Sequence, residues 1–364
     1  MIEVVVNGRF LAQKLTGVQR YAHELMRALD RLFDEGKIDP ARYFIQIAVP
    51  PNTQNTPAYK WIKVIRVGNL INNLWEQITL PLFARNKILF SPCNITPVLG
   101  GTRQIITIHD ASVFGYPQTY TAMFLLKYKI VLRIVSKLAK VILTDSEFSK
   151  NELIRYCKIP AAKIDVVPLG HEHILNVQVD HNVLVVNNLI KRPYLLAVGS
   201  RSAHKNIDGL LLAVDQLKDK NFDLVVAGGV YATVFNNIEF GIHQNHIVLG
   251  YVNDQELRAL YENALCFIYP SWYEGFGLPP LEAMACGCPV IVSDIPALKE
   301  VCADAALYCS PEDPRDIAEK IQQILDHPVL LEKMKHQGTV QASKFRWENT
   351  ATAIWDKITS CVEK

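Results

Sequence analysis

Hydrophobic positions along the chain follow two alternating patterns. Short runs of β-branched and other apolar residues predict strands, and longer stretches in which apolar residues recur every three to four positions predict helices. In the first half we expect strands at Val4–Val6, Phe44–Val49, Ile105–Ile108, Val141–Thr144 and Asp165–Val167, and helices at about 18–32, 120–140 and 146–157. This alternation is typical of an α/β fold with a parallel sheet, so the first half is predicted to form one doubly wound unit.

A second series of the same kind follows an irregular stretch. Residues 176–193 are rich in asparagine and show no helical period, which marks the predicted domain junction. After it we expect strands at Tyr194–Val198, Asp223–Ala227, His246–Leu249, Cys266–Tyr269 and Val290–Ser293, and helices at about 206–219, 253–263, 279–286 and 313–326. The predicted domains are 1–183 and 184–344, and a C-terminal helix in 345–364 is expected to pack back toward the first. Ligands are expected in a cleft at the carboxyl ends of the strands.

The composition agrees with two folded domains. The chain has 364 residues, of which 49% are hydrophobic and 20% charged, so it is long enough for two cores and unlike a disordered chain. A net charge of only +2 gives no overall signal for nucleic acid. We expect the eight cysteines to be reduced and mostly buried in a cytoplasmic protein, because the start resembles a strand rather than a secretory leader. No stretch reaches the roughly 20 apolar residues of a membrane span.

The densest group of candidate site residues lies in the segment YPSWYEGFGLPPLEAMACGCPVIVSD, which begins at the end of a predicted strand. Pro279 and Pro280 suit the first turn of a helix, and Gly287 suits its left-handed end. The loop Ser271–Leu278 therefore leads into a helix N-terminus. Free N–H groups and the helix dipole at such a terminus favour an anion such as a diphosphate.

Two glutamates in this segment, Glu274 in the loop and Glu282 in the first helical turn, can accept hydrogen bonds from the hydroxyls of a sugar and a ribose. Taken singly, they are equally well a solvated loop charge and a complement to the helix dipole. The string EGFGLPPLE, however, resembles the Glu-x7-Glu motif of retaining glycosyltransferases, and nearly the whole chain resembles glycosyltransferase family 4. The resemblance implies the GT-B fold, in which two Rossmann-like domains with doubly wound parallel sheets face each other across a cleft.

The same resemblance assigns roles within the loop. It implies that Glu274 lies beside the donor sugar and that Glu282 holds the ribose. It also implies that the backbone between them approaches the phosphates and the sugar, through Gly275, Phe276, Gly277 and Leu278.

Cationic residues follow the first strand of the second half. The segment AVGSRSAHKN places Arg201 and Lys205 at the carboxyl edge, where two cations can stabilise the charge that develops on a departing nucleoside diphosphate without a metal. The resemblance implies this role for the pair, and it adds Ser200 to the donor site, at a position where many family members carry arginine. Because no acidic cluster is typical of a metal clamp, neither a metal nor another cofactor is expected.

His109 and Asp110 directly follow a predicted strand of the first half. An isolated histidine is more often structural than functional. The pair nevertheless matches the family's His-Asp pair, which implies that His109 contacts the donor sugar, more for positioning than for proton transfer. Asp110 is expected on the acceptor side.

Other strand ends supply weaker candidates. Gly17 follows the first strand, at the start of a predicted helix, where its amide can approach a phosphate or the acceptor, and Tyr21 is expected on the acceptor side. The resemblance also places Tyr251 and Val252, which follow a strand of the second half, near the nucleobase.

A basic stretch lies between Asp110 and Asp145, where the sequence has no acidic residue. It contains Lys127, Lys129, Arg133, Lys137 and Lys140. We expect the last four to share one helical face. Such a face can lie on an anionic membrane, as a peripheral contact around residues 127–140, or can simply be solvated, and the sequence leaves both interpretations open.

Together these features predict a retaining hexosyltransferase that uses a nucleotide sugar. The HKN form of the motif and the opening VNGRFLAQKLTGVQRYAHEL resemble bacterial mannosyl- and related transferases of O-antigen, capsule or exopolysaccharide assembly. GDP-mannose is the expected donor, and a lipid-linked oligosaccharide at the cytoplasmic face of the membrane is the expected acceptor; no nucleic acid partner is expected. Two alternatives stay open: an epimerase or glycosyl phosphorylase of the same fold, and a non-catalytic subunit that binds nucleotide sugars.

Overall fold

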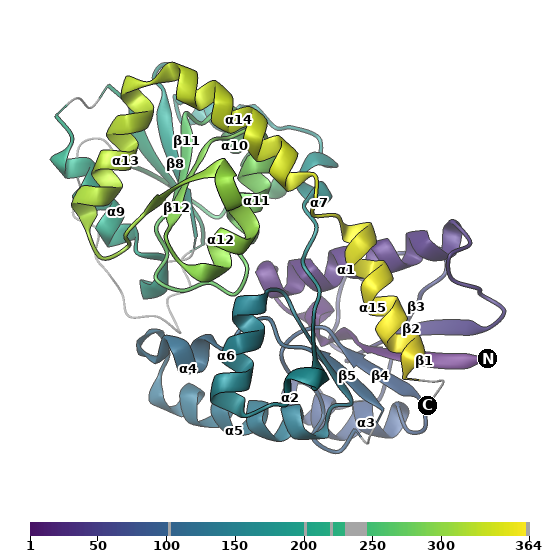
Figure 1. Cartoon of the computed structure of the whole chain (residues 1–364). Coiled ribbons are helices and arrows are strands. Elements are labelled where there is room, and N and C mark those ends of the chain that lie inside the picture. Colours follow the sequence, from purple (N-terminus) through teal and green to yellow (C-terminus); the bar gives the residue numbers. More distant parts are fainter. Residues whose placement is uncertain (101–102, 200–201, 219–220, 230–245, 362–364) are drawn as a thin grey trace. The chain divides into compact units, whose positions relative to one another are not determined.

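The computed structural model describes residues 1–100, 103–199, 202–218, 221–229 and 246–361 (Figure 1). The chain divides into two compact units. The first comprises Met1–Phe114, Met123–Gly170 and Arg346–Lys364, and the second comprises Gly115–Ala122 and His171–Phe345. Each unit has its own parallel sheet, which confirms the prediction of two doubly wound α/β domains.

Seven parallel strands form the sheet of the first unit, in the order β3-β2-β1-β4-β5-β6-β7. They are β1 (Ile2–Asn7), β2 (Tyr43–Val49), β3 (Lys63–Arg66), β4 (Ile88–Ser91), β5 (Gln104–Thr107), β6 (Val141–Thr144) and β7 (Ile164–Val166). In the register, Val5 of β1 lies beside Gln46 on β2 and Leu89 on β4. The strand order reverses between β1 and β4, and open α/β sheets bind ligands at such a switch point.

Helices cover both faces of this sheet. On one face lie α1 (Gly17–Asp34) and α15 (Trp347–Ser360), and on the other lie α3 (Leu80–Phe83) and α5 (Ala122–Leu138) (Figure 1). The other helical segments of this part of the chain are η1 (Gly8–Ala12), α2 (Asn72–Leu74), the π-helical η2 (Trp75–Thr79), α4 (Ser112–Gly115), η3 (Pro117–Thr119), α6 (Glu147–Cys157) and η4 (Ala161–Lys163).

The C-terminal helix α15 belongs to the first unit, although the second unit separates it from the rest of that unit in sequence. Trp355 packs edge-on against Tyr43 with ring centroids 4.9 Å apart. Thr350 Oγ1 donates to Pro168 O at 2.7 Å. These contacts hold the end of the chain against β2 and the segment after β7.

Six parallel strands form the sheet of the second unit, in the order β10-β9-β8-β11-β12-β13. They are β8 (Tyr194–Val198), β9 (Asp223–Ala227), β10 (His246–Gly250), β11 (Cys266–Tyr269), β12 (Val290–Ser293) and β13 (Ala306–Cys309). Here the order reverses between β8 and β11. The helical segments are α7 (Glu172–Leu175), α8 (Asn182–Val186), η5 (Ala203–Lys205), α9 (Ile207–Gln216), α10 (Asp254–Asn263), α11 (Leu278–Ala285), α12 (Pro296–Cys302), η6 (Ala303–Ala305), α13 (Pro314–Asp326) and α14 (Pro328–Ala342).

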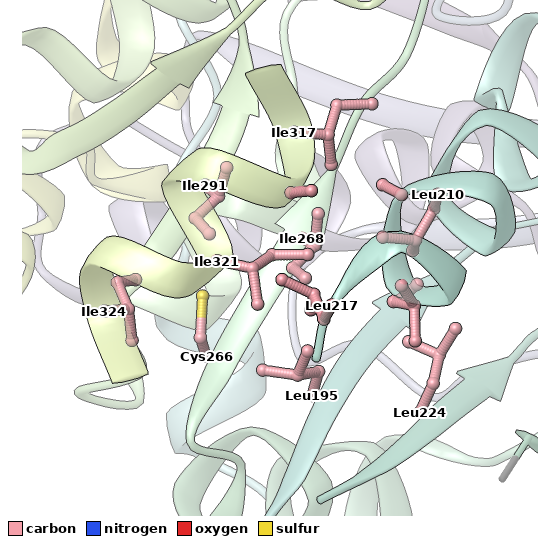
Figure 2. Packing of buried hydrophobic residues seen from close by; sticks show 14 of the residues in the cluster. Leu195, Leu210, Leu217, Leu224, Cys266, Ile268, Ile291, Ile317, Ile321 and Ile324 are labelled. Carbon is pink, nitrogen blue, oxygen red and sulfur yellow. The ribbon is translucent and has the colours of Figure 1, made fainter. Parts of the chain in front are cut away.

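The core of the second unit lies between its sheet and the helices α9 and α13 (Figure 2). Alternate residues of the strands and one stripe of each helix point into it, as expected for periods of two and 3.6 residues. The labelled members are Leu195, Leu210, Leu217, Leu224, Cys266, Ile268, Ile291, Ile317, Ile321 and Ile324. All eight cysteines of the chain are free thiols and six of them are buried, as the sequence predicts.

The two units divide between Gly170 and His171, earlier than the predicted boundary after residue 183. The intervening segment is bonded to the second unit. Arg258 of α10 donates to the carbonyl oxygens of Leu175 and Val177 at 2.6 and 2.9 Å. The irregular composition of residues 176–193 therefore marks the connection, while these hydrogen bonds decide to which unit it belongs.

The basic stretch of the first unit is not one continuous helical face. Because α5 ends at Leu138, the prediction that Lys140 shares a helical face with Lys129, Arg133 and Lys137 is wrong. Lys140 Nζ instead donates to Cys361 O at 2.9 Å. None of the helices in the described part of the chain is long and apolar enough to cross a membrane.

Glycines bring three strand ends of the second unit close together. Gly228, after β9, has φ +147°, and a Cβ atom there would lie 1.9 Å from Gly199 O. Its N–H donates to Gly250 O at 2.7 Å. The backbones that follow β8, β9 and β10 can meet at this edge only because Gly228 has no side chain.

We therefore predict that Gly228→Ala lowers the free energy of unfolding of the second unit by roughly 3 kcal/mol or more, because a steric clash and a positive φ both act against it. Gly250→Ala is the matched control: its φ is +71°, but its Cβ would meet nothing within 4 Å. It should cost only about 1–2 kcal/mol. Denaturant unfolding followed by circular dichroism measures both losses, and equal losses would contradict the steric argument.

Candidate functional site

An ion pair lies at the switch point of the second sheet, between the carboxyl ends of β8 and β11. Lys205 ends the short turn η5 after β8, and Glu274 lies in the loop after β11. Lys205 Nζ donates to Glu274 Oε1 at 2.7 Å and to the hydroxyl of Tyr269 at 2.5 Å. Two residues predicted from separate motifs are thus brought together where open α/β sheets bind ligands.

The Glu274 carboxyl is charged at neutral pH. Burial is the largest single effect and raises its pKa, but the charges of Lys205 and His204 and the hydrogen bonds from Lys205 and Ser271 together lower the pKa overall. The Lys205 ammonium has three N–H donors. Among the described residues, Glu274 and Tyr269 accept two of them, so an oxygen of a bound diphosphate could accept the third.

Asn206 holds the two loops together. It has a left-handed backbone, with φ +55°, which turns the chain from η5 into α9. Its side-chain Nδ2 donates to Pro270 O at 3.1 Å and to Pro311 O at 2.8 Å. In addition, Trp272 N donates to His204 O at 2.8 Å. The turn that carries Lys205 is therefore bonded directly to the loop that carries Glu274.

Glu282 lies on α11 and has partners of its own. The helix begins at Leu278, so Glu282 is in its second turn, and the prediction that it lies in the first turn is wrong. Its Oε1 lies 2.7 Å from His173 Nε2, and its Oε2 accepts a hydrogen bond from the Tyr261 hydroxyl at 3.3 Å. Each carboxylate oxygen keeps a further lone pair, which a ribose hydroxyl could use.

The loop between the two glutamates can offer its backbone to a ligand. Gly277, the N-cap of α11, has φ +107°, and a Cβ there would lie 2.5 Å from Leu298 Cδ2. Phe276 is buried against the ring of Phe345, and Leu278 is also buried. As predicted, Pro residues occupy the first turn of α11, and Gly287 follows the helix with φ +73°.

Other predicted donor contacts lie at neighbouring strand ends. Tyr251 and Val252 directly follow β10, and the Tyr251 side chain is exposed. Ser200 and Arg201, predicted after β8, lie outside the described residues. Within the residues that the structure describes, no group of three or more His, Cys, Asp or Glu side chains could hold a metal ion.

In the first unit, His109 is buried after β5 and is bonded through both ring nitrogens. Nδ1 lies 2.7 Å from Asp145 Oδ2, and Nε2 lies 3.0 Å from Pro92 O. Burial is the largest single effect and lowers the pKa of His109, but the charge of Asp145 and its hydrogen bond, with smaller contributions from Asp110 and the Pro92 carbonyl, together raise the pKa overall. An acceptor oxygen thus lies beside each ring nitrogen, which favours the protonated imidazole and fixes the orientation of the ring.

The remaining predicted residues of the first unit lie close to His109 or near the start of α1. The Tyr21 ring packs edge-on against His109 at 4.7 Å, and its buried hydroxyl is 2.9 Å from Thr107 Oγ1. Asp110 Oδ1 accepts from Ser112 N at 2.8 Å. Gly17 is the exposed first residue of α1, and a Cβ there would meet nothing within 4 Å.

The sequence did not predict the residues that form hydrogen bonds to the predicted site residues or to the loops that carry them. Tyr269 and Asp145 each stand at the end of a predicted strand, so a systematic search of strand ends would have found them. Asn206 is part of the HKN string, and only its left-handed backbone shows what it does. No sequence pattern predicted the contact of His173 with Glu282, because the two residues are 109 positions apart in the chain.

Two family models match the chain, one in each half. The model described as Glycosyltransferase Family 4 matches residues 15–173, and the model described as Glycosyl transferases group 1 matches residues 185–341. The two matches together include each of the predicted site residues.

Curated relatives and solved structures agree with these matches. The O-antigen chain mannosyltransferase B of Escherichia coli is 35% identical over 268 residues, which cover 69% of this chain and 68% of that protein. The O-antigen chain mannosyltransferase RfbU of Salmonella typhimurium strain LT2 is 28% identical over 345 residues, covering 89% of this chain and 92% of that protein. The sucrose-phosphate synthase from Thermosynechococcus elongatus shares the fold, with a TM-score of 0.77, 18% identity and 100% of both chains covered.

The His109 pair predicts a response to pH. Asp145→Asn removes the largest of the effects that raise the pKa of His109, so burial then outweighs the smaller effects of Asp110 and the Pro92 carbonyl and should lower this pKa below 6.5. In the wild type, the stabilisation by the raised pKa is fully present below pH 6.5 and is lost as the pH rises through the raised value. The variant should lack this loss.

NMR titration of the His109 imidazole measures the two pKa values, and unfolding at about pH 6 and about pH 8 measures the stabilities. Asp110→Asn is the control, since the charge of Asp110 contributes less to the pKa of His109 than that of Asp145. An unchanged His109 pKa in Asp145→Asn would show that the pair does not control the charge of the imidazole.

Proposed function

Because this chain belongs to the glycosyltransferases, with a family 4 part followed by a group 1 part, we propose that it is a retaining mannosyltransferase that uses GDP-mannose. The observation that carries the proposal is the ion pair of Lys205 and Glu274 at the switch point of the second sheet. The names of the relatives from Escherichia coli and Salmonella typhimurium, both O-antigen mannosyltransferases, support mannose as the transferred sugar.

In the proposed reaction the bond between the anomeric carbon and the diphosphate breaks, and negative charge develops on the departing phosphate oxygen. Lys205 stabilises this charge with its remaining N–H donor, and Arg201 adds a second positive charge. A fixed cation in a partly buried site stabilises developing charge more than water does, because it needs no reorganisation. In this proposal the cations need no help from a metal ion.

The two glutamates and His109 position the donor. Glu274, held charged by Lys205, accepts hydrogen bonds from sugar hydroxyls, and Glu282, held by His173 and Tyr261, accepts them from the ribose. The amides of the Gly275–Leu278 backbone approach the diphosphate at the start of α11. His109 acts as a fixed cation rather than a base, because both of its ring nitrogens carry protons in the pair with Asp145 and Pro92.

The acceptor belongs to the first unit in this proposal. Tyr21 is buried, so its effect on the acceptor would pass through His109, against which its ring packs. We propose a lipid-linked oligosaccharide of O-antigen or a related surface polysaccharide as the acceptor, supported by the names of the curated relatives. The basic residues of α5 would then lie near an anionic membrane surface.

Mannosyl transfer from GDP-mannose tests the proposal. Lys205→Ala should lower kcat by about 10²–10³-fold, because the leaving diphosphate loses a preorganised cation. Glu274→Gln, which keeps the size of the side chain, should also lose most of the activity. Activity of the wild type should persist in EDTA and should be highest with GDP-mannose among nucleotide hexoses.

Lys335→Ala is the matched control, because Lys335 forms an exposed ion pair with Glu332 at 2.8 Å, a length close to the 2.7 Å of the Lys205–Glu274 pair. It should leave kcat unchanged. Thermal unfolding of each variant separates loss of the site from loss of the fold. Full activity in a folded Lys205→Ala protein would rule out the proposed role of this residue.

A further inference from the structure

The outer side of α5 is apolar where a surface helix is normally polar. Its exposed residues Met123, Leu126, Ile130, Ile134 and Leu138 recur every three to four positions and form one stripe, with Met123 84% exposed. The opposite side of the helix is also apolar, and Leu132 and Val135 there are buried in the first unit. The helix therefore has one apolar side in the core and a second in contact with solvent.

A second stripe of the same kind lies on the segment that runs from α2 through η2 into α3. Leu74, Ile78 and Leu82 are spaced four residues apart and are all exposed, Leu82 by 70%. Trp75 and Leu80 of the same segment are fully buried in a core cluster with residues of β1 and β4. This segment therefore also has one apolar side that is packed in the core and a second apolar side that is exposed to solvent.

The two stripes face the same way. Their helices cover the same face of the first sheet, opposite α1 and α15 (Figure 1), and in each helix the buried side points toward the sheet. The exposed sides of α3 and α5 therefore both point away from it. Exposed apolar side chains that gather on one side of a molecule mark an interaction site more often than scattered ones do.

Positive charge surrounds these stripes. Residues 77–144, which contain most of both, include eight basic residues and a single acidic one, Asp110. Their charge is therefore +7, which leaves −5 for the rest of a chain whose net charge is +2. Arg133 and Lys137 are exposed on α5 itself. The net charge of the whole chain is thus close to zero, although residues 77–144 are strongly cationic.

A cationic cavity opens where α3 and α5 end. Its volume is about 790 Å³, and it is lined by Arg85, Lys87, Arg103 and Lys140, with Glu3 as its acidic residue. It lies at the amino edge of the first sheet, beside the starts of β1 and β4, and so away from His109 at the carboxyl edge. Anionic groups at this surface would therefore meet basic side chains along the helices and at their ends.

We propose that the outer sides of α2–α3 and α5 dock the first unit on an anionic lipid bilayer, with both helices in the plane of the interface. Apolar side chains that enter the boundary between headgroups and acyl chains, flanked by basic residues that contact the headgroups, are the arrangement by which amphipathic helices bind membranes. The inference rests on the proposed function in so far as that function places the acceptor on a membrane lipid. It adds an apolar contact with the bilayer to the electrostatic contact that the proposed function gives to the basic residues of α5.

Flotation of the full-length protein with vesicles tests the proposal. The wild type should bind vesicles that contain roughly a third phosphatidylglycerol and should bind pure phosphatidylcholine vesicles much less. Leu126→Gln/Ile130→Gln and Ile78→Gln/Leu82→Gln should each weaken binding at least about tenfold, because glutamine removes the apolar contact at positions that are already exposed. Arg133→Gln/Lys137→Gln should weaken binding roughly 20-fold at low salt.

The matched control is Leu212→Gln/Val329→Gln, which changes two apolar side chains of the second unit that are 57% and 85% exposed. It should bind like the wild type. Circular dichroism and thermal unfolding confirm that each variant is folded, and sedimentation measures the oligomeric state. Binding that high salt abolishes but the glutamine pairs do not change would leave only the electrostatic contact and overturn the apolar one.

Two other outcomes would also overturn the proposal. The wild type could fail to bind anionic vesicles, or it could form a dimer that the glutamine pairs dissociate, in which case the stripes are a subunit interface. Transfer to a soluble acceptor is measured alongside and should be unchanged in the glutamine pairs. An inactive wild type that still binds vesicles would count against the proposed function alone.

Discussion

The contact between Lys205 and Glu274 is the interaction on which the second unit's site depends. It joins the turn after β8 to the loop after β11 across the point where the strand order reverses, and Asn206 ties the same two loops together through Pro270. A partly buried ion pair stabilises a fold little, since desolvation offsets much of the attraction. The ion pair instead fixes the positions of its two groups. It keeps the Glu274 carboxylate charged and directs the Lys205 ammonium into the same site, where the start of α11 also presents backbone amides.

The same arrangement recurs in the first unit with different residues. Asp145 favours the charged form of His109, as Lys205 favours that of Glu274, and in both pairs the partner's charge and hydrogen bond contribute most to opposing the effect of burial on the pKa. Each unit thus holds a pair of opposite charges at the carboxyl edge of its sheet: His109 with Asp145 in the first and Lys205 with Glu274 in the second. In the proposed reaction, the Lys205 ammonium of the second pair is the cation that stabilises the departing diphosphate.

The sequence predicted most of the fold because strands such as those around Val4 and Ile268 are continuous apolar runs, and helices such as α1 have a clear period. It missed β3, which has only four residues, none of them buried, and β4 and β13, which are equally short. The motif residues around Glu274 could be predicted, since a strand, a glycine loop and a proline-led helix are local signals. The partnership of Glu282 with His173 and the second apolar side of α5 depend on tertiary packing, which no local pattern encodes.

The anomeric configuration of the product tests the central claim most directly. GDP-α-mannose would be incubated with the wild-type protein and a saccharide acceptor, and the one-bond coupling between C1 and H1 of the transferred mannose would be read by NMR. A site built from Glu274, Glu282 and Lys205 as proposed predicts an α-linked product, in which the configuration of the donor is retained. A β-linked product would contradict the account, because the roles proposed for these residues are those of a transfer that retains the configuration of the donor.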